Sequence, residues 1–239
     1  MPGPRHVDLN ADAGEGLPDE TLMPYLTSVS VACGGHAGDA DTMARTLIAT
    51  QRHRLRAGAH PGYPDRAGFG RVAIDISLED LEASLREQLA RLGSIAQQVG
   101  MPLTHVKAHG ALYNRAWRDR ATADVIARAT VAFDPEAALF CPGGSAQEAA
   151  ASAQGLKVLR EVFLDRRYRA DGTLVARDQP GATIAAVADL ADQLSYLQGL
   201  EFETMCVHGD NPAALELLGA VPALFADRDW QVTAYPVKI

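Results

Sequence analysis

The stretch LEDLEASLREQLARLGSIAQQVGMPLTHVKA, residues 78–108, joins a helical pattern to a strand pattern. Apolar residues recur at helical spacing from Leu78 to Val99. Ser77 stands just before the first of them and Asp80 follows three positions later, a pairing that caps the N-termini of helices. In the following segment, residues 103–108, His105 and Lys107 alternate with Val106 and Ala108, which is typical of a strand. The stretch therefore predicts one helix–strand unit.

The same alternation continues toward both ends of the chain. Strand patterns occupy residues 6–9, 28–33, 56–59, 103–108, 137–141, 157–162, 204–208 and 230–235, and further helical patterns occupy residues 43–55, 184–197 and 212–221. Such alternation calls for a parallel sheet covered by helices. We predict an α/β fold, a parallel (β/α) barrel of seven to eight strands with residues 1–239 as one domain, because a single barrel typically has about 250 residues. An open, doubly wound sheet is the alternative that periodicity leaves.

Composition and charge exclude several classes of function. Hydrophobic residues make up 47% of the chain and charged residues 22%, which suffices for a sizeable core. The net charge is −8, whereas nucleic-acid binders concentrate Lys and Arg. No apolar run approaches the roughly 20 residues that span a bilayer. Three cysteines without paired spacing and the lack of a signal-peptide pattern favour a reducing compartment. We expect a cytoplasmic protein with no nucleic-acid partner and no membrane.

Polar residues follow the predicted strands, and this placement predicts a site. In a parallel barrel the chemistry lies at the carboxyl ends of the strands. The polar residues in these segments are Asp8, Asn10, Asp12 and Glu15 after the first strand, His36 and Asp39, then His60, Asp65 and Arg71, then His105, Lys107 and His109, then Glu161, Asp165 and Arg166, and finally His208, Asp210 and Asn211. Five of the seven histidines fall here, so we predict a polar pocket at one rim.

Some of these residues also have a purely structural interpretation. Asp39 precedes a helical pattern and is expected to cap it. Asp210 and Asn211 stand ahead of Pro212, where a helix-capping role and a role in the site are both consistent with the sequence. His105 lies deepest in its strand, so packing and function are equally consistent with its position. No Gly-rich loop of the P-loop type is present. Any nucleotide must therefore bind in another way.

The polar segments resemble a known family. In order, they read VDLNADAGEG (7–16), VACGGHAGDADTM (31–43), GAHPGYPDRAGFGR (58–71), HVKAHGALYN (105–114), REVFLDRRYRADGTLVARDQPGA (160–182) and CVHGDNPAAL (206–215). Together they are similar to the LamB/YcsF family, whose members form one subunit of bacterial 5-oxoprolinase. The resemblance implies a barrel akin to those of glycoside hydrolases and deacetylases. It also implies that 5-oxo-L-proline is cleaved to L-glutamate, with ATP as co-substrate, in a complex with two further subunits, B and C.

The reaction implied by the resemblance needs a base, anion-binding cations and hydrogen-bond donors. We assign Asp12 as the base, Lys107 and Arg166 as anion binders, and His60 and His109 as proton-transfer or hydrogen-bonding groups. The remaining candidates for substrate binding or support are Asp8, Asn10, Glu15, His36, Glu161, Asp165, His208 and Asp210. Because the stem of Lys107 is expected to run along the barrel interior, we predict that Lys107→Met removes the charge with little change in stability.

Two alternatives remain open from the sequence. The first is a metal-dependent hydrolase or deacetylase in which Asp12, His36 and His60 bind a divalent ion. The second is a protein that binds a ligand without catalysis. The chain also departs from the family pattern at two positions, where Gly35 replaces an aromatic residue and Ala108 replaces a proline. The first departure is expected to alter the pocket lining beside His36.

Overall fold

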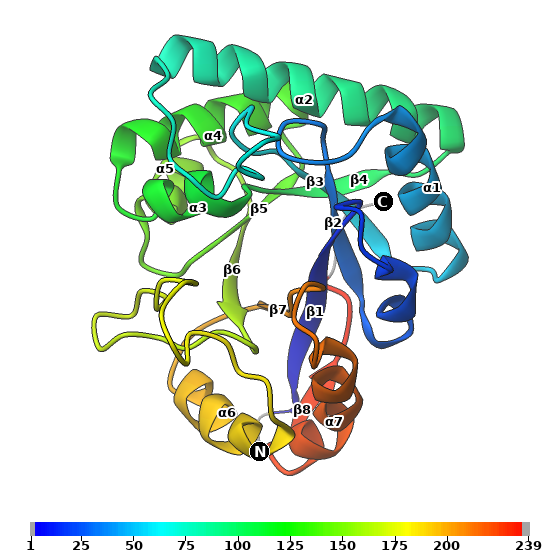
Figure 1. The fold of residues 1–239 in the computed structure, drawn as a ribbon, viewed down its shortest axis with the longest axis vertical. Coiled ribbons are helices and arrows are strands. Elements are labelled where there is room, and N and C mark those ends of the chain that lie inside the picture. Colours follow the sequence, from blue (N-terminus) through cyan, green and yellow to red (C-terminus); the bar gives the residue numbers. More distant parts are fainter. Residues whose placement is uncertain (1–2, 236–239) are drawn as a thin grey trace.

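A computed structural model describes residues 3–235 and contains a closed barrel of seven parallel strands (Figure 1). The strands of the described chain are β1 (Arg5–Ala13), β2 (Ser28–Ala32), β3 (Arg56–His60), β4 (Leu103–Lys107), β5 (Ala138–Cys141), β6 (Val158–Phe163), β7 (Thr204–Cys206) and β8 (Trp230–Val232). Neighbouring strands follow the order β2-β3-β4-β5-β6-β7-β1, and pairing of β1 with β2 closes the ring. The predicted parallel barrel is confirmed.

The eighth strand lies outside the closed ring. The backbone N–H of Thr233 donates to the carbonyl of Val7, and that of Thr27 donates to the carbonyl of Leu9. Alternate residues of a strand direct their backbone groups to the same edge, so Val7 and Leu9 face the same edge of β1. β8 therefore pairs with the amino end of β1, along the same edge of β1 that pairs with β2 further on. The predicted strand at 230–235 is therefore shorter than expected, and it extends the sheet instead of completing the ring.

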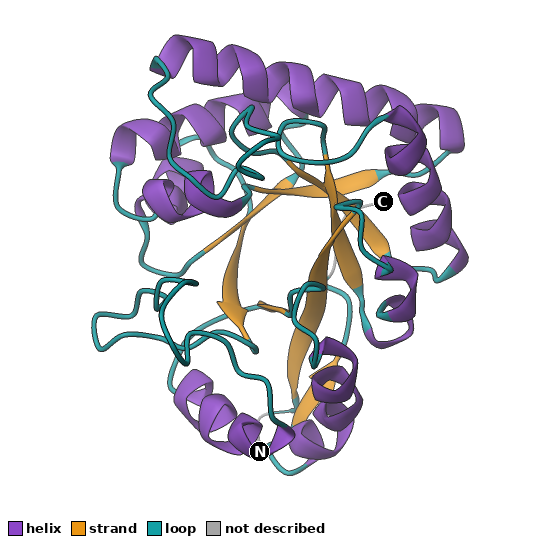
Figure 2. Ribbon diagram, viewed as in Figure 1, coloured by secondary structure: helices purple, strands orange, loops and turns teal. Residues whose placement is uncertain are grey.

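Helices surround the barrel on its outer face (Figures 1 and 2). Their bounds are α1 (Ala40–Arg52), α2 (Leu78–Val99), α3 (Gly110–Ala116), α4 (Arg120–Phe133), α5 (Ala146–Ala153), α6 (Leu190–Gln198) and α7 (Ala214–Ala226), with short 3₁₀ turns η1 (Asp19–Thr21), η2 (Met23–Tyr25) and η3 (Val187–Asp189). The backbone N–H of Asp80 donates to Ser77 Oγ, as predicted for the start of α2. The N–H of Thr42 donates to Asp39 Oδ1, which confirms Asp39 as the cap of α1.

The helical patterns after residue 180 begin later than predicted. Ile184 donates its N–H to the carbonyl of Asp165 and accepts a bond from the side chain of Asn211, so it is tied to the barrel before any helix starts. Pro212 also stays outside its helix. Instead, Asn211 Oδ1 accepts the N–H of Ala213, just ahead of α7. Asn211 therefore has the structural role that the sequence left open.

The first strand is longer than predicted, and this changes where three site residues lie. The sequence placed Asp8, Asn10 and Asp12 in and beyond a strand that ended at residue 9, but β1 continues to Ala13. Successive side chains of a strand point to opposite faces. Val7, Leu9, Ala11 and Ala13 accordingly join the hydrophobic core, and the three polar side chains between them make polar contacts inside the barrel.

The barrel interior is packed at its amino end around His105. This ring is fully buried, contacts Ser30 Oγ at 3.0 Å and Tyr235 Oη at 3.0 Å, and stacks on Phe140 with ring centres 4.0 Å apart. A Cβ atom at Gly58 would lie 2.2 Å from this ring, so only glycine leaves room for it. His105 is therefore a packing residue. Among the described residues no helix is long and apolar enough to cross a membrane.

Candidate active site

A cavity of about 750 Å³ opens at the carboxyl end of the barrel, where the sequence predicted a polar pocket. His60 and Lys107 are the last residues of β3 and β4, and Asp12 is next to the last of β1. The predicted site residues that line the cavity are Asp12, Glu15, His60, Lys107, His109, Arg166, His208 and Asp210. The other predicted residues, Asp8, Asn10, His36, Glu161 and Asp165, do not line it. They lie behind this first layer of side chains, and all of them are buried.

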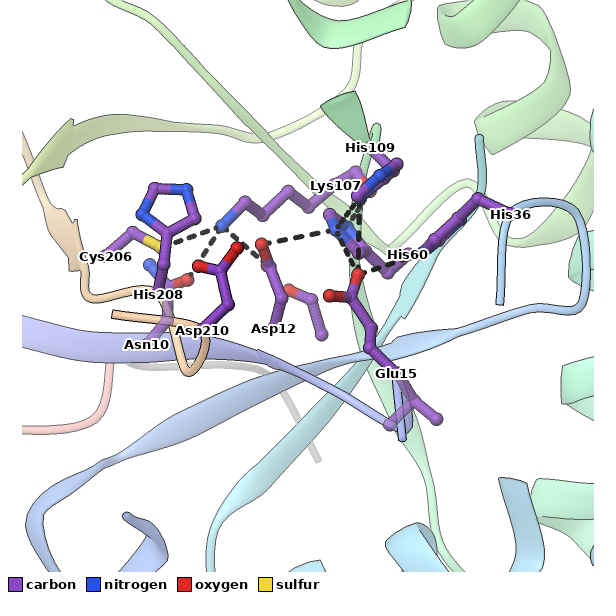
Figure 3. A network of polar contacts seen from close by, with 12 residues as sticks. Asn10, Asp12, Glu15, His36, His60, Lys107, His109, Cys206, His208 and Asp210 are labelled. Carbon is purple, nitrogen blue, oxygen red and sulfur yellow. Dashed lines mark hydrogen bonds and ion pairs between the residues drawn. The ribbon is translucent and has the colours of Figure 1, made fainter. Parts of the chain in front are cut away.

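Lys107 lies at the centre of the site (Figure 3). Its Nζ is 2.8 Å from Glu161 Oε1, 2.9 Å from Asp12 Oδ1 and 3.1 Å from Asn10 Oδ1, and the sulfur of Cys206 is also at 3.1 Å. An ammonium group has three donors, and here they face hydrogen-bond acceptors on Asn10 and Cys206 as well as the two carboxylates. Burial alone would lower the pKa of Lys107, but the charge of Asp12, together with the contacts with Cys206 and Glu161, outweighs burial and raises the pKa well above the usual value. Lys107 is therefore charged and fully engaged.

A second layer of hydrogen bonds supports this centre from below. Asn10 Nδ2 donates to Glu161 Oε1 at 3.0 Å and to Thr204 Oγ1 at 2.8 Å, which leaves its oxygen facing Lys107. Asp8 accepts bonds from the hydroxyls of Thr27, Ser28 and Thr204. Burial raises the pKa of Asp8, although these three donors act against the rise. Asp8 and Asn10 thus position the cavity residues and have no direct access to a ligand.

Three histidines converge on Glu15 beside this centre. Glu15 Oε1 is 2.9 Å from His36 Nε2, 3.3 Å from His109 Nδ1 and 3.7 Å from His60 Nε2. His60 Nε2 is itself 3.0 Å from His109 Nδ1 and 3.3 Å from Asp12 Oδ2. His36 and His109 stack with ring centres 3.6 Å apart and ring planes within 3° of parallel. Asp12 therefore lies between Lys107 on one side and the histidine cluster on the other, as Figure 3 shows.

The electrostatic environment keeps both carboxylates of this group ionised. Burial acts to raise the pKa of Asp12, but the charges of His60 and Lys107 hold it well below the usual value. Burial has the same tendency at Glu15, where the close contacts with the rings of His109 and His36 outweigh it and lower the pKa. Burial lowers the pKa of His36 to about 4, so this ring is neutral at pH 7. For His60 the charge of Asp12 outweighs burial and raises the pKa.

His208 is oriented from behind by Asp165. His208 Nδ1 lies 2.9 Å from Asp165 Oδ1, and Asn211 Nδ2 donates to the other oxygen of the same carboxylate at 3.2 Å. Burial acts to raise the pKa of Asp165, but His208 and these hydrogen bonds lower it. The ring of His208 stacks on Phe163. Asp165 is therefore a positioning residue for His208, which reaches the cavity.

Arginines form the outer wall of the cavity. The arginines that line it are Arg71, Arg118, Arg166, Arg169 and Arg177. The last three come from the segment between β6 and α6, where Arg166 pairs with Thr183 and Tyr168 with Leu174 in antiparallel bridges. The sequence singled out Arg166 as an anion binder but missed Arg169 and Arg177. The arginine-rich stretch REVFLDRRYRADGTLVARDQPGA was the available signal, but it did not show which side chains turn inward.

The partners of these arginines differ. Asp210 bridges Arg71, at 2.6 Å, and Arg177. Arg166 is buried, donates to the carbonyl of Val175 at 2.7 Å, and makes no ion pair among the described residues. Its Nε is buried without a partner. Burial, and then the neighbouring charge of Arg177, lowers its pKa. Arg166 is thus a buried cation at the cavity wall without a carboxylate of its own, which suits an anionic ligand.

Gly35, where the chain departs from the family pattern, is packed against a helix. Gln88 of α2 fills the neighbouring space, with Oε1 accepting the N–H of Gly62 at 3.1 Å and Nε2 donating to its carbonyl at 2.8 Å. A Cβ atom at Gly35 would lie 2.3 Å from Gln88 Oε1. Gly35 itself is packed against Gln88 and does not line the cavity, and the expected change of pocket lining stays a prediction.

Comparisons with known proteins agree with this architecture. The family model described as LamB/YcsF family matches residues 7–238. The chain is 40% identical to the 5-oxoprolinase A subunit of Symbiobacterium thermophilum over 237 residues, which covers 90% of this chain and 89% of that protein. It is also 40% identical to the 5-oxoprolinase A subunit of Neisseria meningitidis serogroup C over 225 residues, 88% of this chain and 92% of the relative.

Solved structures extend the comparison to the fold. A lactam utilization protein from Thermus thermophilus superposes with a TM-score of 0.87 at 34% identity, covering 96% of this chain and 100% of that one. The catalytic domain of a peptidoglycan N-acetylglucosamine deacetylase from Eubacterium rectale gives a TM-score of 0.55 at 12% identity, with 99% and 90% coverage, and shares only the fold. From the match along almost its whole length, the chain belongs to the LamB/YcsF family.

Proposed function

We propose that this chain is the A subunit of an ATP-dependent 5-oxoprolinase, which opens the lactam of 5-oxo-L-proline to L-glutamate with two further subunits, B and C. The observation that carries the proposal is the 40% identity, over about nine tenths of the chain, to proteins named as the A subunit of 5-oxoprolinase. The Thermus thermophilus protein of the same fold is named for lactam utilization, which agrees with a cyclic amide as substrate.

The cavity suits a small anion. The carboxylate of 5-oxoproline and the phosphates of ATP both carry negative charge, and arginine binds such groups through paired donors. Arg166 has donors without a carboxylate partner, whereas Arg71 and Arg177 share Asp210. Because its ammonium is already paired with Asp12 and Glu161 and hydrogen-bonded to Asn10, Lys107 is better suited to hold these groups than to bind a ligand. We therefore place the anion-binding role on Arg166.

The reaction has a simple balance that these residues can serve. Water supplies a hydroxyl to the lactam carbonyl carbon and a proton to the ring nitrogen as the C–N bond breaks, and a second water is consumed when ATP becomes ADP and phosphate. Phosphorylation of the carbonyl oxygen by ATP would couple the two halves and activate a poor electrophile. Asp12 is ionised at the cavity surface and accepts hydrogen bonds, so it is the best-placed residue to orient the attacking water.

The test is an assay of glutamate formed from 5-oxoproline with the purified chain alone and with its presumed partner subunits, in the presence and absence of ATP. We expect turnover only with partners and ATP. Turnover by the chain alone, in a preparation shown by mass spectrometry to lack other subunits, would contradict the shared reaction. No turnover by the full complex would contradict the assigned substrate.

A second candidate function is metal-dependent hydrolysis of an amide without ATP. The convergence of Glu15, His60 and His109 at the cavity surface favours it, because these side chains are common metal ligands. The same assay separates the two functions. ATP-independent cleavage by the chain alone, lost on chelation, would support the second candidate.

A further inference from the structure

We propose that Glu15, His60 and His109 form a binding site for one divalent transition metal ion, of which zinc is the best match. Binding of the ion by this chain does not depend on the identity of the substrate. One ligand atom from each of these residues and one from His36 all lie within 4.8 Å of one another. Hydrogen bonds, spacing and ring orientation each support the site.

Hydrogen bonds fix which nitrogen of each ring faces the cluster with a lone pair. His60 Nδ1 is 2.8 Å from the carbonyl of Lys107, and His109 Nε2 is 2.9 Å from the carbonyl of Phe69. A carbonyl only accepts, so both nitrogens donate. In the neutral rings His60 Nε2 and His109 Nδ1 then present lone pairs to each other across 3.0 Å, next to the oxygen of Glu15. Three electron-rich atoms in contact call for a cation between them.

This arrangement also matches the supporting contacts of known metal sites. Histidines that bind metals almost always donate their other ring N–H to a carbonyl or carboxylate, which fixes the tautomer and the ring orientation. His60 and His109 both do this through backbone carbonyls. Both carbonyls belong to the backbone, so the two rings are held in this orientation without an ion.

The spacing of the three ligand atoms fits a tetrahedral ion. Bonds of about 2.0–2.1 Å to zinc place neighbouring ligand atoms about 3.3 Å apart. The observed separations are 3.0 Å between His60 Nε2 and His109 Nδ1, 3.3 Å between His109 Nδ1 and Glu15 Oε1, and 3.7 Å between Glu15 Oε1 and His60 Nε2. Small movements of the Glu15 side chain would equalise them.

His36 supports the site without being a ligand. Its ring is parallel to that of His109, at 3.6 Å between centres, so one ion cannot lie in the plane of both rings. Instead, His36 Nε2 lies 2.9 Å from Glu15 Oε1 and orients that carboxylate. The three proposed ligands line the cavity, whereas His36 does not. The fourth coordination position therefore faces the cavity, as in catalytic zinc sites.

The other group of metal-ligand side chains in the described chain is already neutralised. Asp12, Cys206 and His208 also lie within 4.8 Å of one another. The ammonium of Lys107 contacts both Asp12 and Cys206, so it occupies the position that an ion would take. The cluster at Glu15 contains no such lysine. This contrast places the ion at Glu15 and not at Asp12.

The test measures metal binding by the complete chain without substrate. After removal of metals by chelation and dialysis, the chain is titrated with Zn²⁺ against a chromophoric competitor, and with Co²⁺, whose visible bands report four-coordinate geometry. We expect one ion per chain. Glu15→Gln and His109→Gln should each weaken binding at least about 100-fold, since loss of even a supporting contact costs about 10–100-fold. His208→Gln, in the same cavity, is the control and should bind as the wild type does.

The outcomes separate this proposal from the proposed function. Melting curves establish that each variant is folded. Because two ligand variants are made, the test still works if one of them does not fold. A folded wild-type chain that binds neither ion, or ligand variants that bind as tightly as the wild type, would overturn the site and leave a shared proton as the cation between the two rings. The glutamate assay is separate, so a metal-binding chain without 5-oxoprolinase activity would contradict only the proposed function.

Discussion

Replacing Lys107 with methionine tests how the centre of the site is held together. The sequence alone predicted little loss of stability, because methionine keeps the apolar part of the side chain. The structure leads to a different expectation. Lys107 neutralises Asp12 and Glu161, and removing it leaves the buried Glu161 and the Asp12 carboxylate, whose side chain is only 10% exposed, without this cation. Breaking a buried ion pair by removing one partner costs about 3–5 kcal/mol.

The expected change in melting temperature follows from the size of the protein. For a chain of this length about 1 kcal/mol shifts the melting temperature by about 2–4 °C, so Lys107→Met should lower it by about 6–20 °C. Thermal and urea unfolding followed by circular dichroism would measure this loss. Arg86→Met on α2 is the matched control, because its exposed ion pair with Glu82 should contribute less than about 1 kcal/mol.

A second substitution tests the cause of the loss. Glu161→Gln removes one of the uncompensated charges, so in the Lys107→Met background it should restore part of the lost stability. A coupling free energy of about 1–3 kcal/mol is expected for residues in direct contact. If Lys107→Met melts within about 2 °C of the wild type, or if Glu161→Gln lowers stability equally with and without Lys107, the buried ion-pair network does not exist as described.

Three further predictions concern other parts of the molecule. In the proposed 5-oxoprolinase complex, Arg166→Gln should raise KM for 5-oxoproline about tenfold or more, with Arg86→Gln as a neutral control; an unchanged KM would remove Arg166 from the site. Burial raises the pKa of Asp19 to about 6, so the folded state holds a proton more tightly than the unfolded state. Stability should therefore increase by about 1–2 kcal/mol as pH falls from about 6 to 4, and Asp19→Asn should abolish this increase in melting curves. Gly58→Ala should cost about 1–3 kcal/mol in urea unfolding because its Cβ would overlap His105; equal stability would show that the ring moves aside.

The barrel could be predicted from the sequence because its signals are local. The helical spacing from Leu78 to Val99 and its cap at Ser77 depend only on neighbouring residues, and both are found in α2. The position of β8 could not be predicted in the same way. Its pairing with β1 joins residues more than 200 positions apart, and a pattern of apolar residues does not specify which edge a strand will join.

The candidate site was predictable in its membership but not in its internal contacts. Strand ends identified His60, Lys107 and His109, because parallel strands bring their carboxyl ends to one rim. Sequence spacing did not show that the ammonium of Lys107 is surrounded by three oxygens, since two of these come from β1 and the third from β6. Nor did it show that His36 and His109 stack, and this stacking is the reason why His36 is a supporting residue and not a ligand in the proposed metal site.

The charges of the site divide into two groups that require different cations. Asp12 and Glu161 share Lys107, whose ammonium is built into the chain. Glu15 faces His60 and His109, whose tautomers leave only lone pairs on that side. The positive charge of this second group must therefore come from a proton or from an ion that the chain does not supply. Because residues of both groups line the same cavity as the arginines, an anionic substrate would meet fixed cations and an exchangeable one in the same cavity. This asymmetry makes the Glu15 cluster, and not Lys107, the place where the state of the site can change.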